Sequence, residues 1–183
     1  MPQTREVVKV IRLLSRTACD ELVASAQSIS NWSASPVYEQ SSAGIRFDRS
    51  YRISSSLMEE TSEQVFTDVR GVIVAQLARF VGPTAEPRFA LSRFELIRYG
   101  PGGRFLPHRD VEADEPWKRY SLVLYVNDGF TGGQTFFPEL QLELRPPPGC
   151  AILFPSFCLH AGQPVVDGTK YIMTMYLGDP RGL

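Results

Sequence analysis

The stretch Tyr99-Gly-Pro-Gly-Gly-Arg-Phe-Leu-Pro-His-Arg-Asp110 contains His108, one of only two histidines in the chain, two residues before the carboxylate of Asp110. In an extended segment, side chains two residues apart point to the same side. The pair can therefore present an imidazole nitrogen and a carboxylate oxygen to one point in space. The other histidine, His160, follows a run that reads as a buried strand ending in a turn, and it can close the set. Two histidines and one aspartate leave three positions of an octahedral ion open, which suits Fe(II) that binds a co-substrate and dioxygen together.

A lysine in an otherwise apolar segment is the second observation that points to a site. Lys170 opens the run Lys-Tyr-Ile-Met-Thr-Met-Tyr-Leu, which reads as a strand with both faces covered. A buried lysine is costly unless an anion meets it or its stem reaches water. Tyr125 would be a second donor to the same anion. A His-x-Asp pair also occurs by chance, and a lone histidine is more often structural, so the coincidence of these features favours a site.

The order and spacing of these features resemble one family. The series is Tyr99, His108-x-Asp110, Tyr125-Val-Asn127, Gly132-Gly133, His160 and Lys170. It resembles the Fe(II)/2-oxoglutarate-dependent dioxygenases, in particular the prolyl 4-hydroxylase-like branch. The resemblance covers residues 89–177 closely and the N-terminal half only in the order of its elements.

The resemblance implies a metal site and its co-substrates. His108, Asp110 and His160 are then the Fe(II) ligands and the catalytic residues, with 2-oxoglutarate and O2 as co-substrates and ascorbate as a candidate accessory reductant. Halogenating relatives replace the carboxylate ligand with a small residue, so the presence of Asp110 favours hydroxylation.

The resemblance also implies a binding site for the distal carboxylate of 2-oxoglutarate. Lys170 stands at the position of the family's lysine or arginine and supplies a point charge. Tyr125 and Tyr99 match tyrosines near the co-substrate. Strand alternation places Thr174 on the same face as Lys170, so Thr174 is a further candidate.

The substrate entrance is predicted less directly. The acidic segment 111–117 is expected to line the entrance, with a solvated loop as an equal alternative. Arg104, Arg109 and Trp117 are the candidate substrate contacts. Segment 31–56, rich in serine, arginine and aromatic residues, reads as short strands and loops; it is either an irregular connection or a lid.

The chain reads as one α+β domain over residues 1–183, with two helices followed by many short strands. The resemblance implies a double-stranded β-helix (jelly roll) core with two supporting N-terminal helices. We expect residues 1–88 to form the support and residues 89–183 the catalytic core.

The two helices are predicted from capping residues and apolar stripes. Ser15 or Thr17 is expected to cap the first helix, and Thr61 with Gln64 has capping-box spacing for the second. Gly82-Pro83 is expected to stop the second helix. The predicted buried stripes are Cys19, Leu22, Val23 and Ala26 in the first helix, and Val65, Val69, Val72, Ile73 and Phe80 in the second.

Composition limits the classes of binding partner and the cellular compartment that we expect. The net charge of −1 offers no basic footprint for nucleic acid, and no apolar run reaches membrane-spanning length. Three cysteines without metal-type pairing indicate reduced, buried thiols. We therefore expect a cytoplasmic protein with a small-molecule or peptidyl substrate and no nucleic-acid or membrane partner; the sequence does not set the oligomeric state.

The predicted function is hydroxylation of an unactivated C–H bond, of a prolyl residue, an amino acid or a related metabolite, with release of succinate and CO2. One alternative is a non-catalytic jelly-roll module that binds a ligand, although such a module needs neither the full triad nor Lys170. A nucleic-acid dealkylase is the other, but that branch has a more basic surface and an arginine pair after the second histidine, which this sequence lacks.

Overall fold

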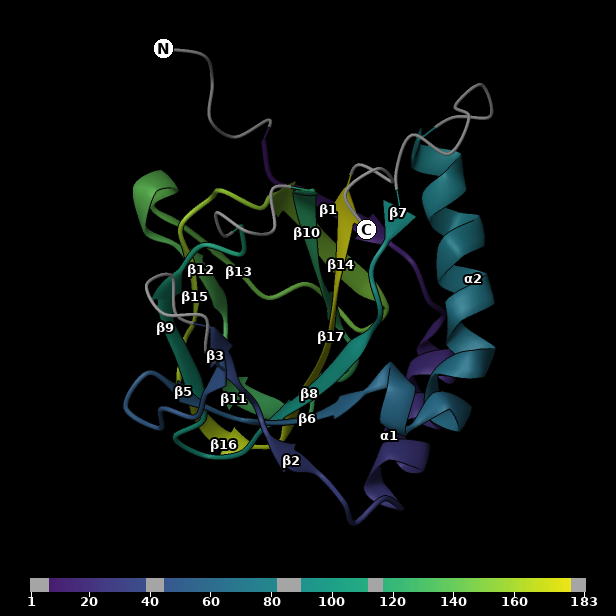
Figure 1. Ribbon diagram of the computed structural model, residues 1–183, viewed down its shortest axis with the longest axis horizontal. Helices are drawn as coiled ribbons and strands as arrows, with labels where there is room; N and C mark the ends of the chain where they lie inside the picture. Colours follow the sequence, from purple (N-terminus) through teal and green to yellow (C-terminus); the bar gives the residue numbers. More distant parts are fainter. Residues whose placement is uncertain (1–6, 39–44, 82–89, 112–116, 179–183) are drawn as a thin grey trace.

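The computed structural model describes residues 7–38, 45–81, 90–111 and 117–178. Two antiparallel sheets face each other across the interior, and both helices lie beside the larger sheet (Figure 1). This arrangement confirms the predicted jelly-roll core with two supporting helices. No helix in the described ranges has the length and apolarity that a membrane crossing requires.

The strands of each sheet come from distant parts of the chain. The larger sheet has the order β1 (Lys9–Arg12), β14 (Cys150–Pro155), β10 (Lys118–Tyr125), β17 (Lys170–Gly178), β8 (Glu95–Tyr99), β6 (Ser55–Met58) and β2 (Ser33–Ala34), and β7 (Ala90–Leu91) also pairs with β17. The smaller sheet has the order β13 (Leu142–Leu144), β12 (Thr135–Phe137), β15 (His160–Gly162), β9 (Arg104–His108) and β5 (Arg52–Ile53). Two further pairs are β11 (Phe130–Gly132) with β16 (Val165–Gly168), and β3 (Val37–Tyr38) with β4 (Ile45–Arg46).

The N-terminal half contributes to both sheets as well as to the helical support. Strands β2 and β6 extend the larger sheet, and β5 pairs with β9 in the smaller one. The short strands predicted within 31–56 are confirmed for the residues that the structure describes. A single domain over 1–183, with strand and helix support in 1–88 and the catalytic core in 89–183, stays a prediction.

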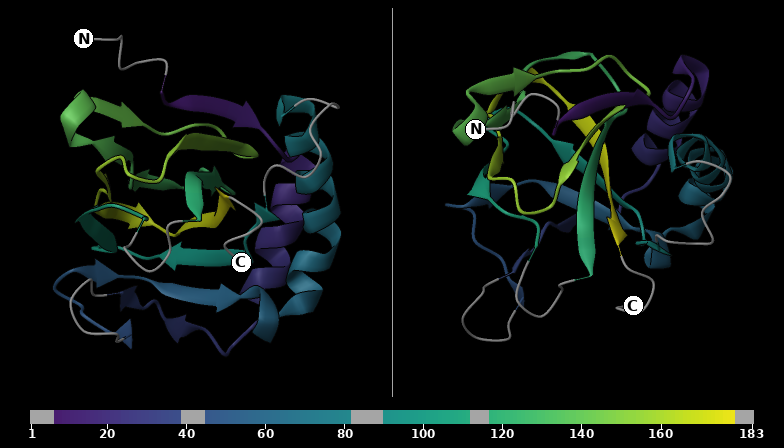
Figure 2. Two further views of the ribbon diagram at one scale, coloured as in Figure 1. Left: turned by 45° about the horizontal axis from the view of Figure 1, so that its top comes forward. Right: turned by 90° about the horizontal axis from the view of Figure 1, so that it is seen from above.

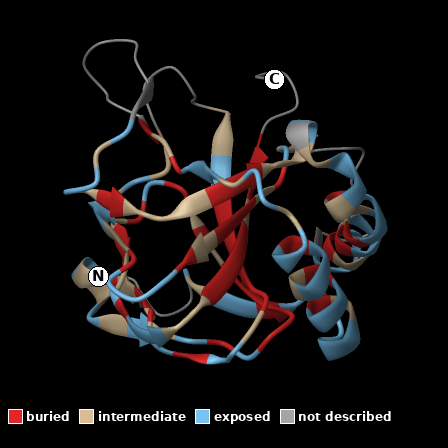
Figure 3. Cartoon of the chain, turned by 90° about the horizontal axis from the view of Figure 1, so that it is seen from below, coloured by how far each residue is buried: buried red, intermediate tan, exposed pale blue. Residues whose placement is uncertain are grey.

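Alternation along β17 explains why this segment is apolar on both faces. Tyr171, Met173 and Met175 belong to the core between the sheet and the helices. Ile172 points the other way, into the core between the two sheets. The central strands are accordingly buried along most of their length (Figure 3). Since Lys170 is in phase with Ile172, its side chain is directed between the sheets, where the site lies.

The first helix forms as its sequence predicts. Helix α1 (Arg16–Gln27) is capped by Ser15, whose side-chain oxygen accepts a hydrogen bond from the backbone N–H of Ala18. Of the predicted stripe, Cys19, Leu22 and Ala26 are buried and Val23 packs against them partly buried. These residues share one core cluster with residues of the larger sheet, and α1 lies beside that sheet (Figure 2).

The second helix differs from the prediction in its start and in its buried face. Helix α2 (Glu63–Val81) follows a 3-10 turn, η2 (Glu59–Thr61), so Thr61 belongs to that turn and does not directly precede the helix. The predicted positions Val72 and Phe80 are exposed. Gly82-Pro83, the predicted stop, lies outside the described residues. Val69 and Ile73 of the predicted stripe are buried and Val65 packs at its edge, and Phe66 and Leu77 complete the face that packs on the sheet.

Candidate metal centre and co-substrate pocket

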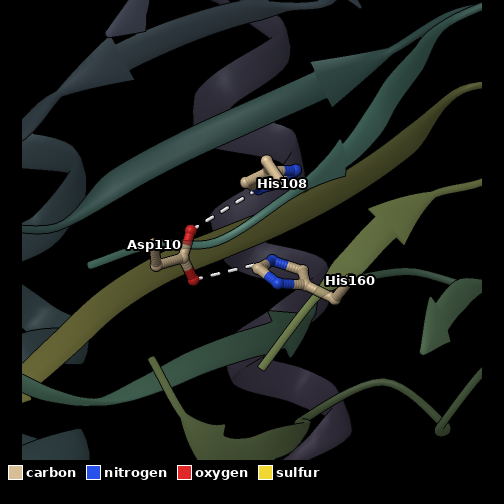
Figure 4. A group of neighbouring side chains, drawn as sticks. All are labelled: His108, Asp110 and His160. Atoms are coloured by element: carbon tan, nitrogen blue, oxygen red, sulfur yellow. Dashed lines mark ion pairs between the residues drawn. The ribbon is translucent and has the colours of Figure 1, made fainter. Parts of the chain in front are cut away.

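Three segments bring His108, Asp110 and His160 together. His108 ends β9 and lies directly opposite His160, the first residue of β15, in the register of the smaller sheet. The backbone N–H of Asp110 donates to the carbonyl oxygen of Ser156, which holds the residue after β9 against the turn before β15. One ligand atom from each of the three side chains lies within 4.8 Å of the other two. The carboxylate is directed between the two imidazole rings (Figure 4).

The hydrogen bonds of the imidazoles leave the same nitrogen of each ring directed at the carboxylate. Nδ1 of His108 lies 2.8 Å from the carbonyl oxygen of Leu106, and Nδ1 of His160 lies 3.1 Å from that of Cys158. Because a carbonyl only accepts, each Nδ1 carries the proton and each Nε2 offers a lone pair. Both Nε2 atoms lie 3.5 Å from an oxygen of Asp110.

The protonation states also suit a ligand set. Burial lowers the pKa of His160 to about 4, which keeps its imidazole neutral at physiological pH. Burial by itself raises the pKa of Asp110, but the imidazoles in their protonated form and a hydrogen bond from Ser121 outweigh it and hold the pKa below its usual range. The phenyl ring of Phe154 packs edge-on against His160, 4.6 Å between ring centroids, and shields this side from water. A neutral imidazole pair and an ionised carboxylate are the forms that bind a divalent metal.

The three side chains line one partly open cavity of about 60 Å³ between the sheets. The same cavity is lined by Tyr99 and Lys170, and by Thr174 farther along β17. The cation and the ligand set therefore belong to one site, as the sequence predicted.

Lys170 is buried at one end of this cavity with only 2% of its surface exposed. Its Nζ donates to the carbonyl oxygen of Gly133 at 2.5 Å and lies 3.5 Å from the hydroxyl of Tyr125. Burial lowers the pKa of Lys170 to about 7, and Arg145 adds to the effect. No carboxylate among the described residues forms an ion pair with it. An anionic ligand that enters the cavity would therefore meet a cation with capacity to bind it.

Backbone geometry allows the lysine to reach this position. Gly133 has φ +66°, in the left-handed region, and a Cβ atom there would lie 3.1 Å from Cδ of Lys170. The Tyr125 hydroxyl is held by Thr135 Oγ1 at 2.8 Å. Thr135 also lines the cavity, yet the sequence analysis did not select it. Its signal was weak, because a threonine after a Gly-Gly turn is equally typical of a hairpin.

The remaining predicted residues lie at different distances from this pocket. Tyr99 pairs with Lys170 across β8 and β17, and its ring centroid lies 5.4 Å from Nζ. The hydroxyl of Thr174 lies 3.5 Å from Oε2 of Glu95, at the opposite end of the cavity wall. Roles in co-substrate binding stay predictions for Tyr99, Tyr125 and Thr174.

The predicted substrate contacts do not line this cavity. Arg104 donates to the backbone of Ser50, and Arg109 pairs with Glu139 at 2.7 Å and with the carbonyl oxygen of Phe157. Trp117 packs beside Gly178. Most of the predicted entrance loop, 112–116, lies outside the described residues, so these contacts stay predictions.

Comparison with known proteins agrees with this geometry. Residues 94–178, just under half of the chain, match the model of the 2OG-Fe(II) oxygenase superfamily. This part of the chain resembles a 2OG-Fe(II) oxygenase domain. It includes the metal-ligand candidates and Lys170, which confirms the family that the sequence motifs resembled.

The curated relatives are similar over part of their length. A putative prolyl 4-hydroxylase of Acanthamoeba polyphaga mimivirus is 26% identical over 108 residues, which are 48% of this chain and 45% of that protein. Prolyl 4-hydroxylase subunit alpha-1 of Gallus gallus is 29% identical over 146 residues, 69% of this chain and 27% of that subunit. The chain thus spans less than half the length of these curated relatives.

Solved structures share the fold. A prolyl hydroxylase from Trichoplax adhaerens, in complex with a hypoxia inducible factor peptide fragment, superposes with a TM-score of 0.75 at 14% identity, covering 96% of this chain and 85% of that one. A Pseudomonas putida prolyl-4-hydroxylase gives a TM-score of 0.60 at 20% identity, covering 94% and 92%.

Proposed function

We propose that this chain is an Fe(II)- and 2-oxoglutarate-dependent dioxygenase that hydroxylates an unactivated C–H bond. The observation that carries the proposal is one cavity that holds two imidazole Nε2 atoms, a carboxylate and, at its far end, a buried lysine. A ligand-binding module without catalysis needs only part of this set. The family match supports the same function.

His108, Asp110 and His160 would hold the Fe(II) ion. Two nitrogen donors and one hard oxygen donor fit ferrous iron, and their positions on one side of an ion leave the other side open. When bound, Fe(II) supplies the activation of dioxygen, so that one oxygen atom ends in succinate and the other in the hydroxyl group of the product. The carbonyl oxygens of Leu106 and Cys158 fix the orientation of the two rings.

Lys170 would bind the distal carboxylate of 2-oxoglutarate, with hydroxyl groups of Tyr125 and Thr135 beside it. Burial lowers the pKa of Lys170 to about 7. An anion that approaches Nζ stabilises the ammonium form and raises this pKa again. The lysine would then take up a proton when the co-substrate binds above neutral pH. The apolar walls, among them Ile97 and Ile172, exclude water around the dicarboxylate.

The substrate we propose is a prolyl residue, a free amino acid or a related metabolite. The named relatives are prolyl hydroxylases, and this similarity favours proline chemistry. We further propose a cytoplasmic location, because all three cysteines are buried and unpaired, as in a reducing compartment.

The test is a substrate screen with purified chain, Fe(II), 2-oxoglutarate and ascorbate. We expect succinate formation and a product heavier by one oxygen atom, and we expect His108→Ala to abolish both. Glu21→Gln, which changes an exposed carboxylate on α1, is the matched control. Binding of 2-oxoglutarate without any succinate formation would instead identify the non-catalytic module.

A further inference from the structure

A carboxylate lines the cavity at the end remote from Lys170. Glu95 of β8 pairs with Thr174 of β17, whereas Lys170 pairs with Tyr99. Four residues along an extended strand span about 13 Å. The cavity therefore has a cationic end at Lys170 and an anionic end at Glu95, where the carboxylate also forms an ion pair with the buried Arg52.

The anionic end lies on the side of the metal-ligand candidates. Thr174 pairs with Val123 of β10, and Ser121, two residues along the same face of β10, hydrogen-bonds Asp110. Glu95 thus lies two strands across from Val123, roughly 10 Å at ordinary strand spacing. A substrate placed beside the open side of the metal would reach this carboxylate.

The Glu95 carboxylate has acceptor capacity to spare. Arg52 Nη2 lies 3.4 Å from Oε1 and Thr174 Oγ1 lies 3.5 Å from Oε2, both at the outer limit for a hydrogen bond. A carboxylate offers about four acceptor positions, and these two are its hydrogen bonds within the described part of the chain. The side chain is 18% exposed and lines the cavity.

Arg52 is anchored elsewhere and does not saturate Glu95. Its Nε donates to Ser54 Oγ at 3.0 Å and its Nη1 to the carbonyl oxygen of Pro36 at 2.8 Å. Its guanidinium carbon also lies 4.7 Å from the ring centroid of Phe105. The two hydrogen bonds are shorter than the 3.4 Å ion-pair contact with Glu95, so Ser54 and Pro36 also fix the position of the guanidinium group.

We propose that Glu95 selects substrates that carry a protonated amine in the same residue as the carbon that is hydroxylated, but not bonded to that carbon: a free amino acid or the amino-terminal residue of a peptide. This inference rests on the proposed dioxygenase function. An ammonium group brings charge and donors to the carboxylate. An internal prolyl residue has no N–H. In this cavity it would displace water from the Glu95 carboxylate without donating a hydrogen bond in its place, which is unfavourable.

The wild-type chain tests this without any substitution. The probes are the free amino acids including L-proline, their N-acetyl derivatives, and short peptides with proline either first or internal. We expect kcat/KM for the preferred free amine to exceed that of its N-acetyl derivative by at least about 100-fold, because the N-acetyl derivative lacks the positive charge and, for proline, the N–H donor as well. The two kinds of peptide and the free amino acids separate the two sources of the amine.

A second experiment compares variants with the wild-type chain. Glu95→Gln should reduce the preference for the amine to below about tenfold, whereas Glu21→Gln should keep it; circular dichroism and thermal unfolding verify that both variants fold. If Glu95→Gln does not fold, the wild-type comparison still decides. Equal turnover of amines and N-acetyl derivatives, or succinate formation with no amine hydroxylated, overturns the inference. A wild-type chain that forms no succinate under any condition refutes the dioxygenase function itself.

Discussion

Replacing Lys170 with methionine should weaken 2-oxoglutarate binding while leaving the free protein at least as stable. Methionine keeps most of the volume of the buried stem but removes the ammonium group. A hydrogen bond to a charged group contributes about 1.5–3 kcal/mol, so the Kd and KM for 2-oxoglutarate should rise roughly 10- to 150-fold. Fe(II) binding should be kept, because Lys170 is not a ligand.

Most substitutions of buried residues lower the free energy of unfolding, but Lys170→Met should not lower it. Burial lowers the pKa of Lys170 from 10.5 to about 7, a difference equivalent to several kcal/mol between the charged and neutral forms. Methionine removes this penalty but also removes the hydrogen bond to Gly133, so the free energy of unfolding at pH 7 should stay constant or rise by about 1–3 kcal/mol.

The pH dependence follows from the same shift. Between about pH 7 and pH 10.5 the unfolded chain binds the lysine proton and the folded chain does not, so wild-type stability should rise with pH through this window. Lys170→Met should lose that contribution. Affinity for 2-oxoglutarate should fall above about pH 7 in the wild type, and Lys170→Arg, which stays charged, should remove that fall.

Two measurements check these statements. Isothermal titration calorimetry of 2-oxoglutarate in buffers of different ionisation enthalpy measures affinity and proton uptake, and urea unfolding measures stability. Lys170→Met with unchanged 2-oxoglutarate affinity and a free energy of unfolding lowered by more than about 2 kcal/mol would show a structural lysine and refute the reasoning.

Three further outcomes are expected. Tyr125→Phe removes one donor beside Lys170 and should raise the KM for 2-oxoglutarate roughly 2- to 10-fold with kcat little changed, which steady-state kinetics measures; an unaltered KM would remove Tyr125 from the pocket's donors. Phe66→Ala opens a cavity between α2 and the larger sheet and should lower the free energy of unfolding by about 3–5 kcal/mol, as urea titration would show; a cost below about 1 kcal/mol would contradict that packing. Gly133→Ala forces a Cβ onto Lys170 at a positive φ and should cost about 1–2 kcal/mol and weaken 2-oxoglutarate binding; calorimetry that finds both unchanged would contradict the close approach.

The sequence predicted those parts of the site that depend on strand periodicity. Alternation placed His108 with Asp110, and Lys170 with Thr174, on single faces, and the structure keeps both pairs in one cavity. Family motifs were needed to bring His160 to the same point, because the pairing of β9 with β15 joins His108 to His160, 52 positions apart, and no local pattern specifies it.

Tertiary packing determined what the sequence analysis missed. The α2 stripe was wrong at Val72 and Phe80 because several registers of an apolar helix fit a 3.6-residue period, and contact with the sheet selects one of them. Glu95 passed unnoticed because a charged residue at the start of a strand is ordinarily solvated. Only the pairing with Thr174 and the approach of Arg52 place its carboxylate in the cavity.

The most direct test of the site is an anaerobic titration of the purified chain with Fe(II) and then 2-oxoglutarate, followed by visible absorption. If His108, Asp110 and His160 hold one ferrous ion while Lys170 holds the far carboxylate, a weak charge-transfer band should appear only when both are present and should saturate at one equivalent of each per chain. His108→Ala should not develop it. Stoichiometric iron binding by the folded wild type with no such band on addition of 2-oxoglutarate would contradict the account.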